Sequence, residues 1–232
     1  YVADDRTTES LDGFWKGLPP EQLASIQGVA MDMWEPFITS TRDHLPDAEG
    51  KIVFDKFHIA QHLSRAVDIV RRREHRELLA QGESALKGTK YLWLRNPESY
   101  SLSQWRSFRA FLRAVQLKTA RAWALKEDFM NVWDYTYPGA AERHFRSWYQ
   151  WARRSRLEPM RDVAAMIRCH WDNIKTYFRH RITNAGSESI NSKVQRVKAM
   201  ARGFRNKERF RMAIYFHCGG LDLYPGRVPV SQ

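Results

Sequence analysis

The first sixty positions alternate between short apolar runs and stretches with helical spacing. Val29–Met33 and Lys51–Phe54 are compact apolar runs typical of buried strands, and Tyr1–Ala3 is expected to end an earlier strand. Helices are predicted between these runs, the first capped by Thr7 or Thr8. Strands that alternate with helices favour a parallel sheet covered by helices. This segment therefore predicts an α/β fold.

The spacing becomes helical from about residue 60 and stays so for more than a hundred positions. A loop is expected across residues 82–97, and Pro138-Gly139 marks a second break. One long helix is predicted from Pro159 to Phe178. The middle of the chain is therefore expected to be all-helical.

An aspartate follows each of the two predicted inner strands. Asp32 comes after the first run, and Asp55 ends the second. In open α/β sheets, functional sites form at the carboxyl ends of the strands, which makes both residues candidates for a site. Aspartate is also a common helix N-cap. For each residue taken alone, both interpretations remain open.

The segment around residues 183–202 combines a predicted helix with an isolated acid. Asn184 can cap this helix. Its expected buried stripe consists of Ile190, Val194, Val197 and Ala201. At about 100° per residue, Glu188 falls roughly 150° from that stripe and is therefore available to a site. The alternative is that Glu188 only complements the helix dipole, which contributes under about 1 kcal/mol.

The formal net charge of +12 favours a polyanionic partner, with nucleic acid as the preferred interpretation and a merely basic soluble protein as the alternative. Residues 101–156 hold 11 Lys or Arg against 4 Asp or Glu, and residues 181–211 hold 9 against 2. An acid isolated among cations, such as Glu188, is consistent with a metal ligand in a groove that binds phosphates.

Most of the nine tryptophans are expected to lie in the core and not to stack on bases.

Other features narrow the class of protein. The sequence contains neither an apolar run of membrane-spanning length nor a visible signal peptide, so a cytoplasmic protein is expected. Cys169 and Cys218 each lie beside a histidine, but their spacing does not match a zinc site. Buried, reduced thiols are the preferred interpretation, with zinc binding as the alternative.

Several motifs, taken in order, resemble one family. Thr-Asn-x-x-x-Glu-x-x-Asn-x-Lys at 183–193, followed by Arg-Gly-Phe-Arg-Asn at 202–206, is similar to the C-terminal signature of insertion-sequence transposases of the ISL-three group. Asp-Met-Trp-Glu-Pro-Phe at 32–37 and Phe-Asp-Lys-Phe-His at 54–58 resemble the same family. The similarity covers nearly the whole chain.

This resemblance implies a ribonuclease-H-like (retroviral integrase-like) core interrupted by a helical insertion. The core would comprise residues 1–60 and 181–232, with residues 61–180 as the insertion. Asp32 matches the second catalytic carboxylate and Glu188 the third, both as metal ligands. An older alignment of the triad would choose Asp55 in place of Asp32.

The resemblance also implies supporting residues and partners. His58 and Asn184 would support the site. Phosphates of double-stranded DNA, both transposon ends and target, would contact basic residues: Lys193, Arg196, Lys198, Arg202 and Arg205. Two Mg²⁺ or Mn²⁺ ions would act as cofactors in DNA cleavage and strand transfer. The full-length protein would form a homo-oligomer and associate with the bacterial nucleoid.

The first catalytic aspartate is expected upstream of Tyr1, with Asp4 and Asp5 as weak substitutes. The chain is thus expected to be a catalytic fragment that is inactive alone. A non-catalytic DNA-binding module from a decayed or domesticated element is the main alternative. A junction resolvase is disfavoured because that class needs no long helical insertion.

Overall fold

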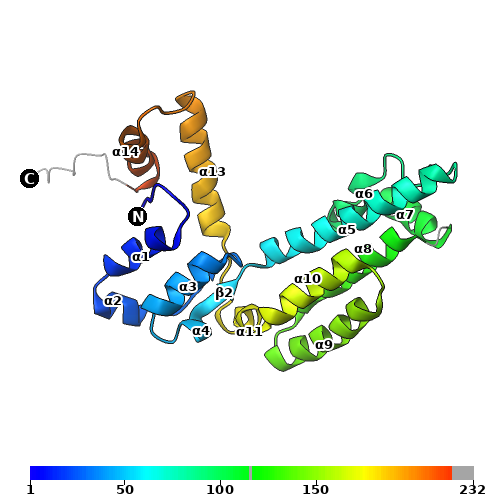
Figure 1. Ribbon diagram of the computed structural model, residues 1–232, viewed down its shortest axis with the longest axis horizontal. Coiled ribbons are helices and arrows are strands. Elements are labelled where there is room, and N and C mark those ends of the chain that lie inside the picture. Colours follow the sequence, from blue (N-terminus) through cyan, green and yellow to red (C-terminus); the bar gives the residue numbers. More distant parts are fainter. Residues whose placement is uncertain (115–116, 221–232) are drawn as a thin grey trace, which may run out of the picture.

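The computed structural model describes residues 1–114 and 117–220. The end of the predicted segment 181–232 therefore lies outside the described residues. Most of the described chain is helical, with one short sheet (Figure 1). The elements in chain order are α1 (Thr8–Lys16), α2 (Pro20–Ser25), β1 (Val29–Met31), α3 (Glu35–His44), α4 (Ala48–Lys51), β2 (Ile52–Phe54), α5 (Lys56–Ala80), α6 (Lys90–Leu94), η1 (Pro97–Ser99), α7 (Leu102–Ala114), α8 (Lys118–Met130), η2 (Asn131–Asp134), α9 (Pro138–Arg154), α10 (Glu158–Cys169), α11 (Trp171–Lys175), α12 (Tyr177–His180), α13 (Ala185–Met200) and α14 (Lys207–Cys218).

The sheet consists of β1 and β2 in parallel. Val29 pairs with Ile52 and Met31 with Phe54. All three residues of β2 are fully buried. The parallel α/β arrangement predicted from these two runs is confirmed, although each strand is shorter than the apolar run that predicted it, because Lys51 ends α4 and Met33 follows the strand.

The predicted strand end at Tyr1–Ala3 is wrong. These residues have no regular secondary structure. The Tyr1 ring lies 5.8 Å from the ring of Phe14 on α1, and the neighbouring Asp4 carboxylate pairs with Arg211 on α14 at 2.9 Å. The N-terminal segment is thus held by side-chain contacts to two helices and not by a sheet ladder.

A long helical arm extends from the end of β2. The 25-residue α5 leaves the sheet, and α8 and α10 pack along it, with α9 on the outside (Figure 1). Glu74 on α5 is buried and accepts hydrogen bonds from the backbone N–H groups of Lys118 and Thr119 at 2.6 and 2.7 Å. This carboxylate satisfies two of the free N–H groups at the start of α8 and so fixes that helix on α5.

The chain returns to the sheet through three short helices and not through the single helix predicted from Pro159 to Phe178. That helix is broken after Cys169 and again at Thr176. The Thr176 hydroxyl lies 2.6 Å from the carbonyl oxygens of both Ile52 and Asn173. His180 Nε2 lies 2.7 Å from the Gly50 carbonyl oxygen. The helix breaks because the returning segment must bend to follow β2.

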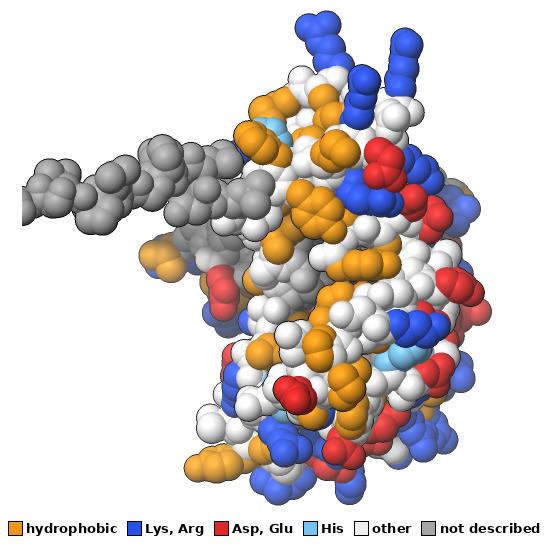
Figure 2. Space-filling view, turned by 90° about the vertical axis from the view of Figure 1, so that its left-hand side faces the viewer, with side chains coloured by type: hydrophobic (Ala, Val, Ile, Leu, Met, Phe, Trp, Pro, Cys, Tyr) orange, Lys and Arg blue, Asp and Glu red, His pale blue; other side chains and the backbone are white. Residues whose placement is uncertain are grey.

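The last two helices form a hairpin that projects from the sheet end of the molecule (Figure 1). Because α13 packs chiefly on α14, little of its surface is covered. Val197 is buried, as predicted, but Ile190 is 50% exposed and Ala201 is also exposed, so the predicted four-residue stripe is wrong at these two positions. Figure 2 shows this end of the molecule, with Lys and Arg side chains protruding at the α13–α14 turn above a face rich in hydrophobic side chains.

Aromatic side chains fill much of the core, as expected. Five of the nine tryptophans are buried: Trp15, Trp93, Trp133, Trp148 and Trp171. The expectation of buried thiols is wrong, because Cys169 is exposed and Cys218 only partly buried. In the described ranges, no helix is both long and apolar enough to cross a membrane.

Candidate active site

Asp32 and Asp55 lie side by side at the carboxyl edge of the sheet. Each follows the last residue of its strand, and the backbone N–H of Asp55 donates to the Met31 carbonyl oxygen at 3.2 Å. Neighbouring strands in a sheet lie about 4.8 Å apart, so the two acids are direct neighbours across the ladder. The structure thus places both aspartates at the edge where the sequence predicted a site.

Asp55 is a buried connector between two distant segments. Its side chain caps α5 through the Phe57 N–H, which donates to Oδ1 at 2.8 Å. Its other oxygen, Oδ2, accepts a hydrogen bond from the backbone N–H of Asn184 at 2.8 Å. The residue is only 3% exposed. Both carboxylate oxygens are therefore engaged by backbone groups, one local and one 129 positions away.

The Asp55–Asn184 contact sets where α13 begins. Asn184 occupies the N-cap position, as predicted, but its side chain makes no capping hydrogen bond. Its backbone N–H is used by Asp55, and its carbonyl oxygen accepts from the Glu188 N–H at 3.0 Å. Glu188 is partly buried and lies one helical turn beyond this anchor. The first turn of α13 is thereby held at the same edge of the sheet as Asp32.

A cation already lies against Asp32. The guanidinium of Arg6 forms an ion pair with Oδ2 of Asp32. The same guanidinium lies 5.3 Å from the Trp34 ring centroid and 5.4 Å from that of Phe37, a cation–π arrangement that holds it in place. Arg6 was not among the residues singled out from the sequence, and its distance of 26 positions from Asp32 left no local signal.

The first turns of α5 carry two histidines, of which His62 is close enough to Asp32 to feel its charge. His58 is partly buried, and His62 follows it by one helical turn. Burial lowers the pKa of His62 below its usual value of 6.5, the charges of His58 and Arg65 lower it further, and the negative charge of Asp32 raises it. His62 was missed in the sequence, although the i, i+4 spacing from His58 is a signal that could have identified it.

We predict that His62 titrates below 6.5 and that Asp32→Asn lowers its pKa further, because the substitution removes the one neighbouring charge that raises it. His62 is thus neutral at pH 7. Its contribution to stability is fully present above pH 6.5 and is lost as the pH falls toward the lowered pKa, because the unfolded chain takes up the proton first. NMR titration of the histidine ring protons measures both values. If the pKa of His62 is unchanged or raised in the variant, the charge of Asp32 does not act on His62.

The five predicted phosphate-binding residues lie on or just after α13: Lys193, Arg196, Lys198, Arg202 and Arg205. All are exposed, and none pairs with a carboxylate among the described residues. Arg202 adopts the left-handed backbone conformation with φ 53°, and Gly203 follows with φ 96°, where the chain turns toward α14. These cations lie along the α13–α14 hairpin, and Glu188 lies in the first turn of α13.

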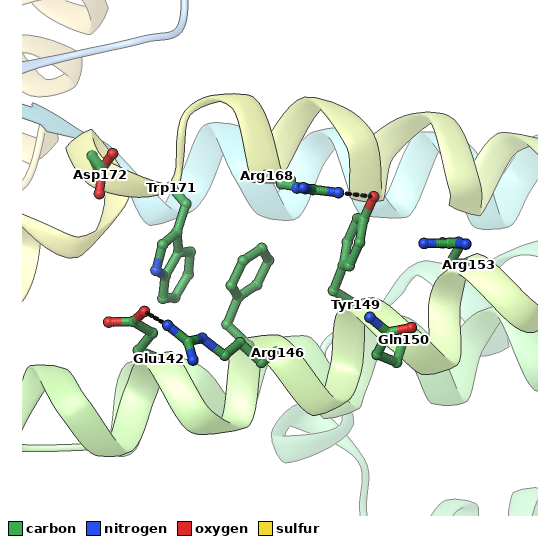
Figure 3. A pocket seen from close by; sticks show the side chains of 9 residues that line it. Glu142, Arg146, Tyr149, Gln150, Arg153, Arg168, Trp171 and Asp172 are labelled. Atoms are coloured by element: carbon green, nitrogen blue, oxygen red, sulfur yellow. Dashed lines mark hydrogen bonds and ion pairs between the residues drawn. The ribbon is translucent and has the colours of Figure 1, made fainter.

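One cavity lies elsewhere, on the arm. It has a volume of about 510 Å³ and opens between α9 and α10 (Figure 3). Phe145 and Trp171 stack at 3.9 Å between ring centroids, and Arg168 donates to the Tyr149 hydroxyl at 3.1 Å. Its acids, Glu142 and Asp172, form ion pairs with neighbouring cations. The cavity contains none of the residues at the carboxyl edge of the sheet.

Comparison with known proteins identifies the family. Residues 1–214 match the ISL3 family of DDE enzymes, described as transposase. The chain belongs to this transposase family. It is 27% identical over 217 residues to the transposase for insertion sequence element IS1001 of Bordetella parapertussis, covering 92% of this chain and 53% of that protein. It is 26% identical over 251 residues to the transposase for IS1557 of Mycobacterium tuberculosis, covering 98% and 56%. The chain thus spans about half the length of these relatives. No solved structure matches it.

Two of the acids singled out from the sequence have the donor type that a divalent cation takes. Asp32 and Glu188 offer carboxylate oxygens, the ligand type that Mg²⁺ and Mn²⁺ prefer. The Arg6 guanidinium shows that Asp32 accepts a positive charge. Within residues 1–114 and 117–220, no three His, Cys, Asp or Glu side chains gather closely enough to hold a metal ion. The donor types therefore fit a divalent cation, but the described residues do not complete its coordination.

Proposed function

We propose that this chain is the catalytic part of a DDE transposase that cuts and joins insertion-sequence DNA with divalent cations. The single observation that carries the proposal is the hydrogen bond from Asn184 to Asp55. It holds the helix of Glu188 at the sheet edge where Asp32 lies. An acid from an early strand and an acid from a late helix thus share one end of the sheet, as the chemistry requires.

Within this proposal the three acids have different roles. Asp32 and Glu188 are the metal ligands, because each keeps at least one carboxylate oxygen without a hydrogen-bond partner among the described residues. Asp55 has a positioning role, because both of its oxygens accept backbone hydrogen bonds. His58 lies in the first turn of α5 and would support the same edge. This division favours Asp32 over Asp55 as the second catalytic aspartate.

The proposed architecture follows from these roles. Residues 1–60 and 181–220 would form part of a ribonuclease-H-like core, and residues 61–180 would be the helical insertion. The insertion leaves the sheet at Asp55 and returns to it at Thr176, which is consistent with a segment inserted into an existing core.

The chain's own residues would prepare the site for its substrate. A pair of divalent cations would supply activation of the attacking oxygen and stabilisation of the leaving oxygen. Arg6 holds Asp32 as a paired carboxylate and would have to move aside when a cation binds. The exposed cations on and after α13, Lys193 to Arg205, would hold DNA phosphates along the hairpin that carries Glu188. The described residues contribute two carboxylates, so we expect no DNA cleavage by the 232-residue chain alone.

A non-catalytic DNA-binding module is the second candidate. The incomplete metal cluster among the described residues favours it. In that case Asp32 would serve only as the partner of Arg6, and DNA binding would not change with divalent cations.

Localised backbone cleavage tests the proposal on the chain itself. Fe²⁺ in place of Mg²⁺, with ascorbate and peroxide, generates hydroxyl radicals that cut the polypeptide next to the bound ion. We expect cuts near residues 30–34 and 185–190, because both segments flank the proposed ligands. Arg6→Gln should strengthen the cuts by removing the competing cation.

The matched control is Asp47→Asn, which removes an exposed acid remote from this edge of the sheet. Cuts should persist in this variant and disappear in Asp32→Asn and Glu188→Gln. Cuts that survive both ligand substitutions would reject the proposed metal site and leave the DNA-binding alternative.

A further inference from the structure

One face of α7 carries three arginines and no acid. Arg106, Arg109 and Arg113 are exposed, and at 100° per residue they fall within about 60° of one another around the helix. None of the three forms an ion pair among the described residues. The sequence contains no Asp or Glu between residues 99 and 126. The face is therefore a patch of uncompensated positive charge.

Several exposed arginines elsewhere in the described chain are paired with carboxylates. Arg42 pairs with Glu49, Arg73 with Glu158, and Arg146 with Glu142, at 2.5 to 2.7 Å. On the arm itself, Lys118 pairs with Glu77 at 2.5 Å. Local carboxylates neutralise these side chains, so they have less to gain from a phosphate. The α7 face lacks such competition.

The opposite face of α7 fixes the orientation of the arginines. Phe108 is 2% exposed, and its ring centroid lies 5.2 Å from that of Trp93 and 5.1 Å from that of Trp123. Trp105 packs on Phe108 at 6.0 Å. Because this aromatic cluster anchors α7, the helix cannot rotate to bury the arginines. The cationic face is thus held toward solvent.

The spacing of the face suits a nucleic-acid backbone. Arg106 and Arg113 are seven residues apart, or about 10 Å along the helix axis. Double-stranded DNA carries one charge per about 1.7 Å of axis, so three guanidinium groups over this length can reach phosphates of one duplex. A partner of this kind, dense in anions and long, matches a stripe of cations better than a single small anion does.

The position of α7 adds a geometric condition. It lies at the end of the arm farthest from the sheet (Figure 1). The 25-residue α5 that spans this interval is roughly 37 Å long. At about 3.4 Å per base pair, a duplex touching both the sheet edge and α7 would extend over about eleven base pairs.

We propose that the face of Arg106, Arg109 and Arg113 is a second DNA-binding surface, which holds the backbone of the duplex about one helical turn from the candidate active site. This inference rests on the proposed function in taking double-stranded DNA as the partner. It assigns that partner to residues on the arm, apart from the cations on and after α13.

Fluorescence anisotropy with a labelled 30-bp duplex tests the inference on the 232-residue chain. Arg106→Gln, Arg109→Gln and Arg113→Gln together should weaken binding about tenfold and reduce the slope of log K against log salt concentration by about 2.7, since each lost phosphate contact contributes about 0.9. Replacing the same three residues with lysine should restore the slope, because the charge is kept.

The control is Arg42→Gln, Arg73→Gln and Arg146→Gln, which changes the net charge equally but removes arginines already paired with carboxylates. It should leave the slope within about 1 of the value for the unsubstituted chain.

Equal losses in both triple variants, or an unchanged slope in the α7 variant, would overturn the inference while DNA binding itself stands. If the unsubstituted chain binds no DNA, both the inference and the DNA partner of the proposed function fail. If binding is intact but Asp32 and Glu188 prove irrelevant to metal, only the catalytic proposal fails.

Discussion

Replacing Asp55 with alanine is expected to lower the free energy of unfolding by about 3 kcal/mol, and replacing it with asparagine by about 2 kcal/mol. The carboxylate is 3% exposed and accepts hydrogen bonds from the Phe57 and Asn184 N–H groups. Alanine leaves both donors without a partner. Asparagine keeps one acceptor oxygen but turns an NH₂ group toward the other donor.

Chemical denaturation and thermal melting measure this loss. For a chain of this size, 2 kcal/mol corresponds to a fall in Tm of roughly 4–8 °C. Asp32→Asn is the matched control, because it removes an acid at the neighbouring position whose only ion-pair partner in the described chain, Arg6, is mostly exposed. We expect a change within about 1 kcal/mol for it. If Asp32→Asn proved the more damaging substitution, the roles assigned to the two acids would have to be exchanged.

The second large effect concerns catalysis in the full-length transposase. On the proposed function, Asp32→Asn or Glu188→Gln is expected to reduce the rate of DNA-end cleavage by about a thousand-fold or more, because the loss of a proposed metal ligand would remove several kcal/mol of transition-state stabilisation. Duplex binding in the absence of divalent cations should stay within about twofold. A cleavage assay on labelled element ends, with anisotropy in parallel, separates the two properties.

Positional controls sharpen this prediction. Ser192→Ala alters an exposed residue one turn after Glu188 on α13 and should leave the cleavage rate unchanged. Equal losses of binding and cleavage in the Asp32 and Glu188 variants would indicate a role in holding DNA, in line with the non-catalytic alternative.

The sequence predicted the features that depend on local pattern. The structure confirms the two parallel strands, which follow from apolar runs, and Thr7 as the cap of α1. It also confirms that α13 starts after Asn184, although the Asn184 side chain does not cap the helix. The burial of most tryptophans was expected from their size. The match to the transposase family likewise followed from contiguous motifs, including Phe-Asp-Lys-Phe-His at 54–58.

The features it could not predict depend on distant contacts. Arg6 reaches Asp32 across 26 positions, and the Asn184 N–H reaches Asp55 across 129. The helix expected from Pro159 to Phe178 has continuous helical spacing, but the hydrogen bond from Thr176 to Ile52 requires a bend that this spacing does not encode. Ile190 has the position of a core residue on α13, yet α14 alone cannot cover it.

The most direct test of the central claim is the position of a bound cation. Crystals of the full-length transposase grown with Mn²⁺ would show the ion by its anomalous scattering. The account predicts a peak roughly 2.0–2.5 Å from carboxylate oxygens of both Asp32 and Glu188, with Asp55 still hydrogen-bonded to the Asn184 N–H. A peak that Asp55 coordinates in place of Asp32, or carboxylates of Asp32 and Glu188 more than about 10 Å apart with no ion between them, would contradict it.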